Sequence, residues 1–464
     1  MIISDLWRGK RFAVLGLARS GAATVAALAA SGAEVTAWDA KPATRDTLLS
    51  TFPGEGRGPE GVAEVVGEGG SLQLPASRLD PGLRRGTVRV EDVESVDLTG
   101  FDALVVSPGV PLNRHPVAAK ARAAGIAIIG DIELFAQARA GLPPHKVVGV
   151  TGTNGKSTTV SLIHHILRAA GIPSRLGGNI GAPILAQEPL PEGGVYVLEL
   201  SSYQIDLTKR LDCDVAVLLN ITPDHLDRYD GFQAYADSKA RLFAMQSADH
   251  AAIIGIGDTA SAQIARGLSA RGEHLTKIAP GVCMDQSRWP SLQGPHNAQN
   301  ALAAIAACQA LGVSEADINH GLESFTGLPH RMQRVAVRNG VAFIDDSKAT
   351  NPESVAPALA AFDRIHWILG GQAKSDDLDA CAPHFGRVER AYTIGEAGAK
   401  FAALLAPHMA VEESGTLSAA VASAAKHAAT DETILLSPAC ASFDQFRDYE
   451  DRGDQFRAAV EALA

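Results

Sequence analysis

A short glycine-containing segment, Thr151-Gly-Thr-Asn-Gly-Lys-Ser157, separates a predicted strand at Val147–Val150 from a predicted helix over 158–170. The helix is predicted because apolar residues recur at helical spacing. Backbone N–H groups in such a turn point inward, and the helix N-terminus adds a partial positive charge. Lys156 would then reach the terminal phosphates of a nucleotide, and the Ser157 hydroxyl could ligate Mg²⁺. The segment therefore predicts a nucleoside-triphosphate site.

The match to the usual phosphate-loop pattern is close but incomplete. That pattern requires glycine at position 150, where this chain has valine. The alternative is a plain strand-to-helix turn that happens to contain Gly-Lys-Ser. We favour nucleotide binding because strand, glycines, lysine, hydroxyl and helix occur in the required order. The loop residues predicted to hold the nucleotide are Gly152, Thr153, Asn154, Gly155, Lys156, Ser157 and Thr158.

Further polar groups follow predicted strands in the same part of the chain. Glu199 closes a strand at 195–200, where a carboxylate could bind Mg²⁺; a helix-capping or salt-bridging glutamate is the alternative. Asp224 and His225 follow a strand at 215–220, and such a pair could ligate a second cation or position a substrate acid. Asn297 and Asn300 precede a predicted alanine-rich helix. Their amide groups could form hydrogen bonds with the edge of a nucleotide base, or Asn297 could cap the helix.

Three polar turns in the C-terminal third also follow predicted strands. They are Asp345–Asn351, the turn that contains Lys374, and the turn that contains Ser442. Because the ends of parallel strands meet at one edge of a sheet, we expect one shared cleft. Lys374 and the Ser442 hydroxyl, with N–H groups of a helix beginning near Phe443, would suit an anionic carboxylate. Cys440 has no evident cationic partner, so we interpret it as a packing residue.

The composition limits the class of protein. A chain of 464 residues suggests about three domains, and 46% hydrophobic with 20% charged residues is ordinary for a globular protein. A net charge of −11 argues against a nucleic-acid partner. Five scattered cysteines predict no disulfide framework or zinc site. With no signal peptide and no apolar run of about 18 residues, we expect a cytoplasmic protein without membrane spans.

Alternating strands and helices predict three α/β blocks with parallel sheets. The first opens with a strand at 12–15, a glycine turn, a helix to about residue 30 and a strand at 34–38. That order, with Asp39 about 20 residues after the turn, imitates an NAD site, but Ala18 replaces the glycine that admits a pyrophosphate. A Gly/Glu-rich stretch at 53–71 is expected to form a surface loop or a disordered insert. A linker is predicted at 140–145.

Taken together, the motifs resemble the Mur ligase family over nearly the whole chain. They are, in order, GDIELF (130–135), TGTNGKST (151–158), GGNIG (177–181), LELSSYQ (198–204), TPDHLDRY (222–229), GLPHRM (327–332), DDSKATN (345–351) and SPACASFDQF (437–446). The combination is similar to the members that add D-glutamate. The resemblance implies an N-terminal Rossmann-like domain (1–135), a central P-loop ATPase-like domain (136–326) and a C-terminal Rossmann-like domain (327–464).

The resemblance implies an ATP-dependent ligase that joins D-glutamate to UDP-N-acetylmuramoyl-L-alanine through an acyl phosphate. It assigns ATP phosphates and one Mg²⁺ to Lys156, Ser157 and Glu199, and a second Mg²⁺ to His225 and a carbamylated Lys239. The ATP clamp would contain Asn297, Asn300, Arg331 and Asp346. The residues implied in substrate binding are Ser20, Ser107, Asn179, Ser201, Thr350, Lys374, Ser442 and Tyr449.

Two other functions remain open from the sequence. One is a folylpolyglutamate-type ligase, which shares the phosphate loop but is disfavoured by DDSKATN and SPACASFDQF. The other is a nucleotide-binding switch whose third domain binds a partner. The positions expected to face uracil are Arg19, Ser20, Ala40 and Lys41, and they depart from the family pattern. We expect a monomer that acts on small molecules, with neither nucleic acid nor membrane as a partner.

Overall fold

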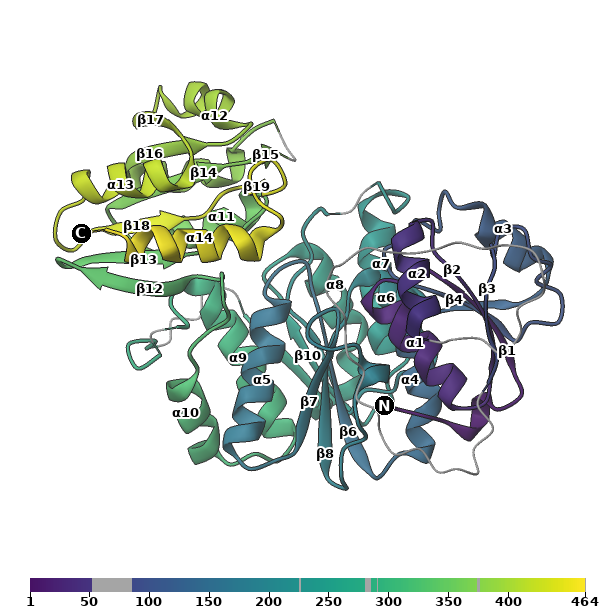
Figure 1. The fold of residues 1–464 in the computed structure, drawn as a ribbon. Coiled ribbons are helices and arrows are strands. Elements are labelled where there is room, and N and C mark those ends of the chain that lie inside the picture. Colours follow the sequence, from purple (N-terminus) through teal and green to yellow (C-terminus); the bar gives the residue numbers. More distant parts are fainter. Residues whose placement is uncertain (52–85, 225–226, 280–284, 290, 374–375, 464) are drawn as a thin grey trace. The chain divides into compact units, whose positions relative to one another are not determined.

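The computed structural model describes residues 1–51, 86–224, 227–279, 285–289, 291–373 and 376–463 (Figure 1). These residues form two compact units. The first comprises residues 1–160, 170–277 and 310–312, and the second comprises 161–169, 278–309 and 313 onward. The Gly/Glu-rich stretch at 53–71 lies outside the described residues, as do His225 and Lys374.

The first sheet has the strand order of a dinucleotide-binding half. Its five strands lie in the order β3-β2-β1-β4-β5, and every neighbouring pair is parallel. The elements are β1 (Arg11–Leu15), α1 (Arg19–Ala30), β2 (Glu34–Trp38), α2 (Pro42–Thr51), β3 (Val88–Val90), β4 (Ala103–Val106), α3 (Pro116–Ala123), β5 (Ala127–Ile129) and α4 (Asp131–Ala138). The predicted strand–helix–strand opening is confirmed.

The second sheet places the strands that precede the phosphate loop, Glu199 and Asp224 side by side. Its order is β11-β10-β9-β6-β8-β7, so the strands before the phosphate loop, Glu199 and Asp224 are neighbours, and β6 is parallel to both β8 and β9. The elements are β6 (His145–Thr151), α5 (Lys156–Ala169), β7 (Ser174–Gly178), β8 (Gly194–Glu199), α6 (Ser202–Asp206), β9 (Val215–Leu218), α7 (Gly231–Ala244), β10 (Ala251–Gly255), α8 (Thr259–Gly267) and β11 (Leu275–Ile278).

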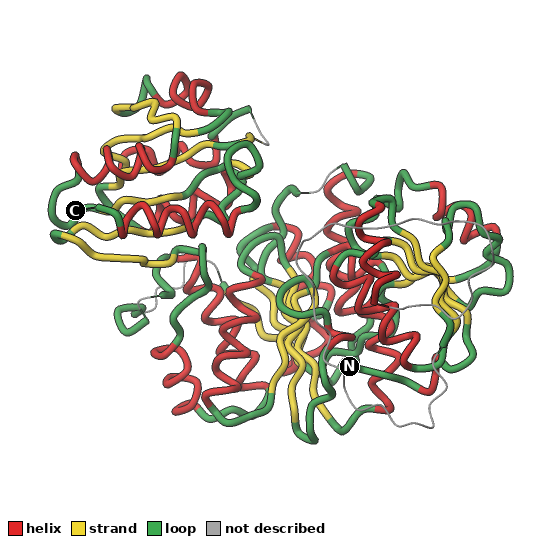
Figure 2. Tube along the Cα trace, viewed as in Figure 1, coloured by secondary structure: helices red, strands yellow, loops and turns green. Residues whose placement is uncertain are grey.

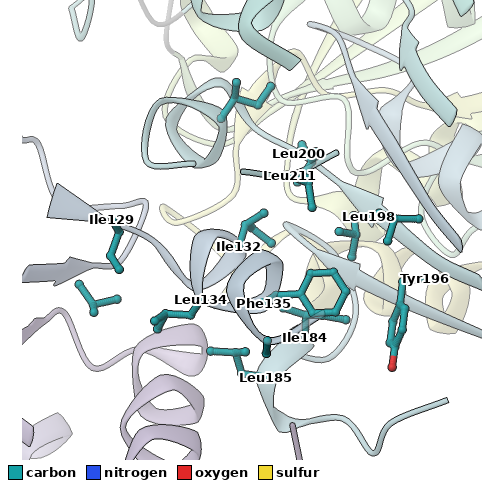
Figure 3. Close-up of a cluster of buried hydrophobic side chains, with 14 of the residues drawn as sticks. Ile129, Ile132, Leu134, Phe135, Ile184, Leu185, Tyr196, Leu198, Leu200 and Leu211 are labelled. Atoms are coloured by element: carbon teal, nitrogen blue, oxygen red, sulfur yellow. The ribbon is translucent and has the colours of Figure 1, made fainter. Parts of the chain in front are cut away.

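One hydrophobic cluster joins the first two sheets (Figure 3). Phe135 of α4 is fully buried, and its ring meets that of Tyr196 on β8 edge-on at a centroid distance of 5.0 Å. Glu133 on the same helix is also buried, and its carboxylate accepts hydrogen bonds from the backbone of Lys209 (2.7 Å) and Arg210 (3.1 Å). The GDIELF motif thus docks α4 between the two sheets, where burial of apolar area stabilises the junction.

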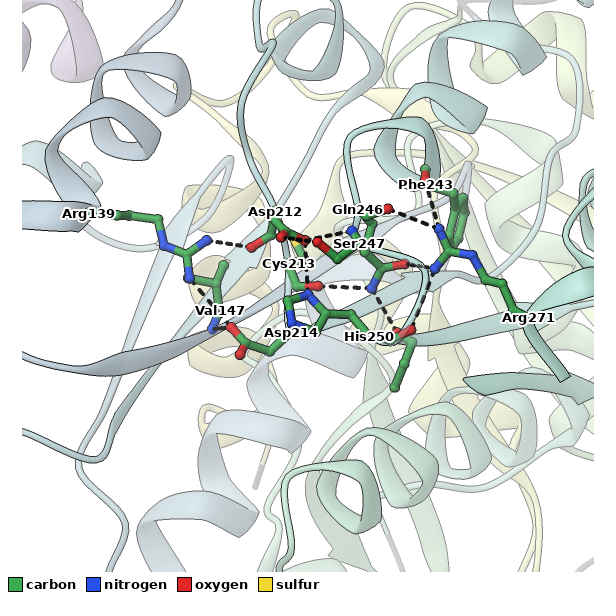
Figure 4. A network of polar contacts seen from close by, with 11 residues as sticks. Arg139, Val147, Asp212, Cys213, Asp214, Phe243, Gln246, Ser247, His250 and Arg271 are labelled. Atoms are coloured by element: carbon green, nitrogen blue, oxygen red, sulfur yellow. Dashed lines mark hydrogen bonds and ion pairs between the residues drawn. The ribbon is translucent and has the colours of Figure 1, made fainter. Parts of the chain in front are cut away.

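A polar network surrounds the start of β9 (Figure 4). The Asp214 carboxylate accepts from the backbone N–H of Val147 at 2.8 Å and lies 3.5 Å from Arg139. Asp212 pairs with Ser247 and His250, and Gln246 donates to the Cys213 carbonyl at 2.9 Å. These bonds satisfy backbone groups that would otherwise be buried without partners, and so fix the register of β6 and β9.

The third sheet, in the second unit, has the order β12-β13-β18-β14-β16-β17, with only the β12–β13 pair antiparallel among the registers described. Its elements are β12 (Gln333–Arg338), β13 (Val341–Asp345), α11 (Pro352–Ala361), β14 (Ile365–Gly370), β16 (Val388–Ile394), α12 (Gly398–Leu405), β17 (Ala410–Gly415), α13 (Leu417–His427), β18 (Thr433–Leu436) and α14 (Tyr449–Glu461). A short ladder pairs β15 (Gln372–Ala373) with β19 (Cys440–Ala441). The unit also contains α9 (Pro295–Ala310) and α10 (Glu315–Ser324).

Helices cover both faces of the third sheet (Figure 2). Residues of α11 and α12 share one core cluster with Trp367 and Leu369, whereas α13 and α14 share another with Phe343 and Tyr392. The α/β fold class with three parallel or mostly parallel sheets is confirmed. Among the described residues, no helix combines the length and apolar content that a membrane span requires.

Candidate active site

The phosphate loop is held by the strand beside it. The N–H groups of Thr153 and Asn154 donate to the carbonyl and the side-chain oxygen of Asn220, both at 2.9 Å. Gly155 has a φ of +84°, a conformation that glycine adopts without strain. Because the N–H groups of Thr153 and Asn154 are engaged in this way, a phosphate would meet the N-terminal end of α5, where the helix dipole adds a partial positive charge.

Lys156 lies folded over this loop. Its ammonium donates to the carbonyls of Gly152 (2.9 Å) and Thr153 (2.8 Å). Val150, which replaces the usual glycine, is buried in β6 and pairs with Glu199 on β8. The departure from the usual pattern at Val150 therefore lies within β6 and does not alter the turn at 152–155.

Glu199 is the centre of a buried oxygen cluster. It ends β8 and is 3% exposed, and one carboxylate oxygen accepts from the Ser157 hydroxyl at 2.7 Å. The other accepts from the Asn179 side-chain amide at 2.9 Å. A hydroxyl and a carboxylate are the hard oxygen ligands that Mg²⁺ prefers, so the residues present fit such an ion. The described contacts of Glu199 are with a hydroxyl and an amide, and they favour a metal-binding role over a salt bridge.

Lys239 is a buried lysine beside the same loop. It lies on α7, is 2% exposed and donates to the Gly152 carbonyl at 3.0 Å. Its ammonium also lies 4.7 Å from the Tyr235 ring centroid. Burial, together with the positive charge of Lys156, lowers the pKa of Lys239 well below its usual value. A lowered pKa increases the fraction of the uncharged, nucleophilic amine, and the side chain is shielded from solvent.

In the first sheet, the glycine turn is closed by its neighbours. The Ser107 hydroxyl donates to the Gly16 carbonyl at 2.7 Å. The Asp39 carboxylate accepts hydrogen bonds from the backbone N–H groups of Leu17 (2.7 Å) and Lys41 (2.9 Å). Its oxygens are therefore engaged by the protein backbone, at the glycine turn and just after β2. Ser20 is half-buried in the first turn of α1. Ser201, also predicted in substrate binding, caps α6 in a reciprocal pair with Gln204.

Asn297 and Asn300 lie inside α9, not before it. The helix begins at Pro295, so the alternative that Asn297 caps it is wrong. Asn300 donates to the Asn297 side-chain oxygen at 3.1 Å, and both are nearly buried. The adjacent His296 side chain is half-buried, its Nδ1 is buried with no partner among the described residues, and desolvation lowers its pKa to about 4. These side chains form a neutral amide and imidazole surface.

Arg331 and Asp346 are brought together by an unusual backbone. His330 and Met332, on either side of Arg331, have φ values of +59° and +49°. The Asp346 carboxylate accepts from the Met332 N–H (3.1 Å) and the Ser437 hydroxyl (2.8 Å). Burial raises the pKa of Asp346 to about 7. Strained backbone of this kind persists only where its surroundings fix it, and it is frequent at functional sites.

The residues predicted to bind the amino acid follow three neighbouring strands, β13, β18 and β14. Thr350 follows β13, and Ser442, which is 2% exposed, follows β19. The predicted helix near Phe443 is wrong: residues 442–448 form a turn, and α14 begins at Tyr449 because the Asp448 side chain caps it. Tyr449 meets the ammonium of Lys348, 3.6 Å from its ring centroid. Cys440 is buried in the core, as expected for a packing residue.

Sequence reasoning missed a supporting residue in each of the two units. Asn220 anchors the phosphate loop, and its position just after β9 was the available signal. Arg452 is fully buried in α14 and donates to the carbonyls of Ser347 (2.8 Å) and Cys440 (3.0 Å). Nothing in its sequence surroundings distinguishes Arg452 from a surface arginine.

Two family models match the chain. The Mur ligase middle domain matches residues 150–282, and the glutamate ligase domain of Mur ligases matches residues 330–440. Their boundaries enclose the phosphate loop, Glu199 and Lys239 in one case, and Asp346 and Lys374 in the other.

Curated relatives and solved structures agree with these matches. The chain is 58% identical to the UDP-N-acetylmuramoylalanine–D-glutamate ligase of Novosphingobium aromaticivorans, over 100% of this chain and 97% of that protein. It is 53% identical to the protein of the same name from Zymomonas mobilis, over 100% of both. The UDP-N-acetylmuramate–alanine ligase of Thermotoga maritima has the same fold, with a TM-score of 0.55, 14% identity and coverage of 98% and 99%. By this similarity over its full length, the chain belongs to the Mur ligase family.

Proposed function

We propose that the chain is an ATP-dependent ligase that adds D-glutamate to UDP-N-acetylmuramoyl-L-alanine in the synthesis of peptidoglycan precursors. The observation that carries this function is its similarity, at 53–58% identity and over the full chain, to relatives that bear the name of that ligase. The buried Ser157–Glu199 pair beside a phosphate loop supports it.

The three sheets support the proposal that each of three domains binds a different substrate. We assign the UDP-linked substrate mainly to residues 1–135, ATP mainly to 136–326 and D-glutamate to 327–464, with some residues of one domain serving the ligand of its neighbour. In this assignment Ser20, Ser107, Asn179 and Ser201 serve the UDP-linked substrate. Thr350, Lys374, Ser442 and Tyr449 serve D-glutamate, and Asn297, Asn300, Arg331 and Asp346 serve ATP.

The chemistry follows from the weakness of a carboxylate as an electrophile. An oxygen of the substrate carboxylate attacks the γ-phosphorus of ATP, the bond to ADP breaks, and an acyl phosphate forms. The amine of D-glutamate attacks the acyl carbon, and phosphate leaves from the tetrahedral intermediate. Lys156 lies where it can leave the loop carbonyls and neutralise the transferred phosphoryl group.

Ser157 and Glu199 would hold one Mg²⁺, which neutralises phosphate charge when bound. We propose His225 and a carbamylated Lys239 as ligands of a second ion. An uncharged lysine amine can add to CO₂, forming an N–C bond with loss of one proton. The product is an anion with acceptor oxygens, whereas an ammonium cannot ligate a metal. The buried position and lowered pKa of Lys239 support this modification.

The carbamate proposal has its own test. We expect Lys239→Ala to be inactive and partly rescued by short-chain carboxylic acids, because these restore an anionic ligand. Lys209→Ala, an exposed lysine of the same unit, is the matched control and should need no rescue. An unmodified amine in the intact mass and crystal density of active enzyme would refute the proposal.

Phosphate release from ATP tests the function itself. We expect release only when UDP-N-acetylmuramoyl-L-alanine and D-glutamate are both present, with each omitted in turn. Release without either acceptor would indicate a nucleotide-binding switch, and a requirement for folate substrates would indicate the folylpolyglutamate-type alternative. We place the reaction in the cytoplasm and propose a monomer, which gel filtration at assay concentration would test.

A further inference from the structure

Arg228 connects the loop after β9 to the loop after β4. Its guanidinium donates to the carbonyl of Val110 at 2.8 Å and approaches that of Gly109 at 3.5 Å. In return, the side-chain amide of Asn113 donates to the Asp227 carbonyl at 3.1 Å. All of these residues belong to the first compact unit.

On one side, the contacts of Arg228 continue to the glycine turn of the first sheet. The Val110 N–H donates to the Ser107 carbonyl at 3.0 Å, and the Ser107 hydroxyl donates to the Gly16 carbonyl at 2.7 Å. Only two residues therefore separate the guanidinium from the turn that we assign to the UDP-linked substrate.

On the other side, the guanidinium of Arg228 packs against the first of three tyrosine rings that contact one another. Its guanidinium lies 4.4 Å from the Tyr203 ring centroid, and Tyr203 stacks on Tyr229 at 5.9 Å with an interplanar angle of 9°. Tyr229 packs against Tyr235 at 5.5 Å, and the Tyr235 hydroxyl lies 3.2 Å from that of Thr153 in the phosphate loop. The Tyr229 hydroxyl also donates to Asp206 at 2.8 Å.

These two loops also border a cavity of about 170 Å³, lined in part by Val110, Asn113, Tyr203 and Arg228. Side chains that line a cavity have fewer packing partners on that side, so the hydrogen bonds of Arg228 contribute to fixing the loop after β4. A guanidinium suits that task because its planar fork can serve two acceptors while its face stacks on a ring. A lysine ammonium can keep the charge but not both contacts.

We propose that Arg228 is a positioning residue for the UDP-linked substrate: it holds the Ser107–Val110 loop, and through it the Gly16 turn, against the central sheet. The inference rests on the proposed function, because it takes that turn as the diphosphate subsite. No contact between Arg228 and a substrate is required.

The test is a comparison of Arg228→Ala and Arg228→Lys with the unaltered chain. We expect both variants to raise the KM for UDP-N-acetylmuramoyl-L-alanine about tenfold to a hundredfold, the usual cost of losing charge-assisted hydrogen bonds. The KM values for ATP and D-glutamate and the kcat should change less than threefold. Calorimetry without ATP should show the same weakening of UDP-substrate binding, and methylguanidinium should partly restore the Ala variant.

A matched control is Arg210→Ala. The guanidinium of Arg210 lies 3.4 Å from the carboxylate of Glu133 on α4, so this variant removes a different arginine contact of the same unit, away from the Ser107–Val110 loop. It should leave all three KM values unchanged. Equal losses for all substrates in the Arg228 variants, or full rescue by lysine, would overturn the positioning role. Failure of the unaltered chain to ligate would instead reject the proposed function.

Discussion

Lys156 is the residue on which the phosphate-loop assignment depends. We expect Lys156→Ala to lower the ligation rate by about 10²–10³, the typical effect of removing one electrostatic group from a reacting centre. Lys146→Ala is the control, since Lys146 is an exposed lysine near the start of β6, the strand that precedes the phosphate loop. Steady-state phosphate release checks the result, and near-normal turnover of a folded Lys156 variant would reject the assignment.

The protonation of the Asp131 carboxyl group is expected to change the free energy of unfolding with pH. Burial raises its pKa from 3.8 to about 6 in the folded chain. The unfolded chain therefore releases this proton first, and the free energy of unfolding falls as pH rises from 4 to 6, by up to about 3 kcal/mol. We expect Asp131→Asn to reduce this fall, whereas Asp46→Asn at an exposed position should not.

Urea titrations at pH 4, 5, 6 and 7 would measure the effect for Asp131. Parallel slopes for the unaltered chain and Asp131→Asn would show that this carboxyl does not titrate as its burial implies. Ligase activity is not needed for this measurement, since Asp131 has no assigned role in binding.

At the scale of elements, the residues that follow three strands of the third sheet predict variants that are impaired in D-glutamate binding but not in ATP binding. We expect Ser442→Ala and Lys374→Ala to raise the KM for D-glutamate at least tenfold more than that for ATP, because both are proposed to meet its carboxylates. Ser418→Ala, on an exposed position of α13, should change neither. Equal effects on both substrates would remove these residues from the pocket.

The elements also mark what the sequence could predict. The phosphate loop, Glu199 at a strand end and the order of polar turns follow from local patterns, and the structure contains them. The helix expected near Phe443 fails because Asp448, which accepts from the Asp451 N–H at 2.8 Å, sets the start of α14. The roles of Asn220 and Arg452 arise from partners 66 and 105 residues away, a distance that no local pattern reports.

At the scale of the whole molecule, the first domain tests the difference between fold and function. Its strand order is that of a dinucleotide-binding half, yet Ala18 and the engaged Asp39 carboxylate disfavour NAD. We expect calorimetry to show binding of UDP-N-acetylmuramoyl-L-alanine by the full chain without competition from NAD(H). Tight NAD(H) binding that the UDP-linked substrate displaces would reopen an oxidoreductase function.

The bond from Leu17 to Asp39 also bears on ligand design. A turn whose Leu17 N–H and Gly16 carbonyl are already paired with Asp39 and Ser107 has its shape before a ligand arrives. Little conformational entropy is then lost by the protein on association, and the flexible diphosphate chain of the ligand loses most of it. An inhibitor for this turn would therefore gain affinity chiefly from a cyclic or otherwise rigid replacement of that chain, rather than from additional hydrogen-bonding groups.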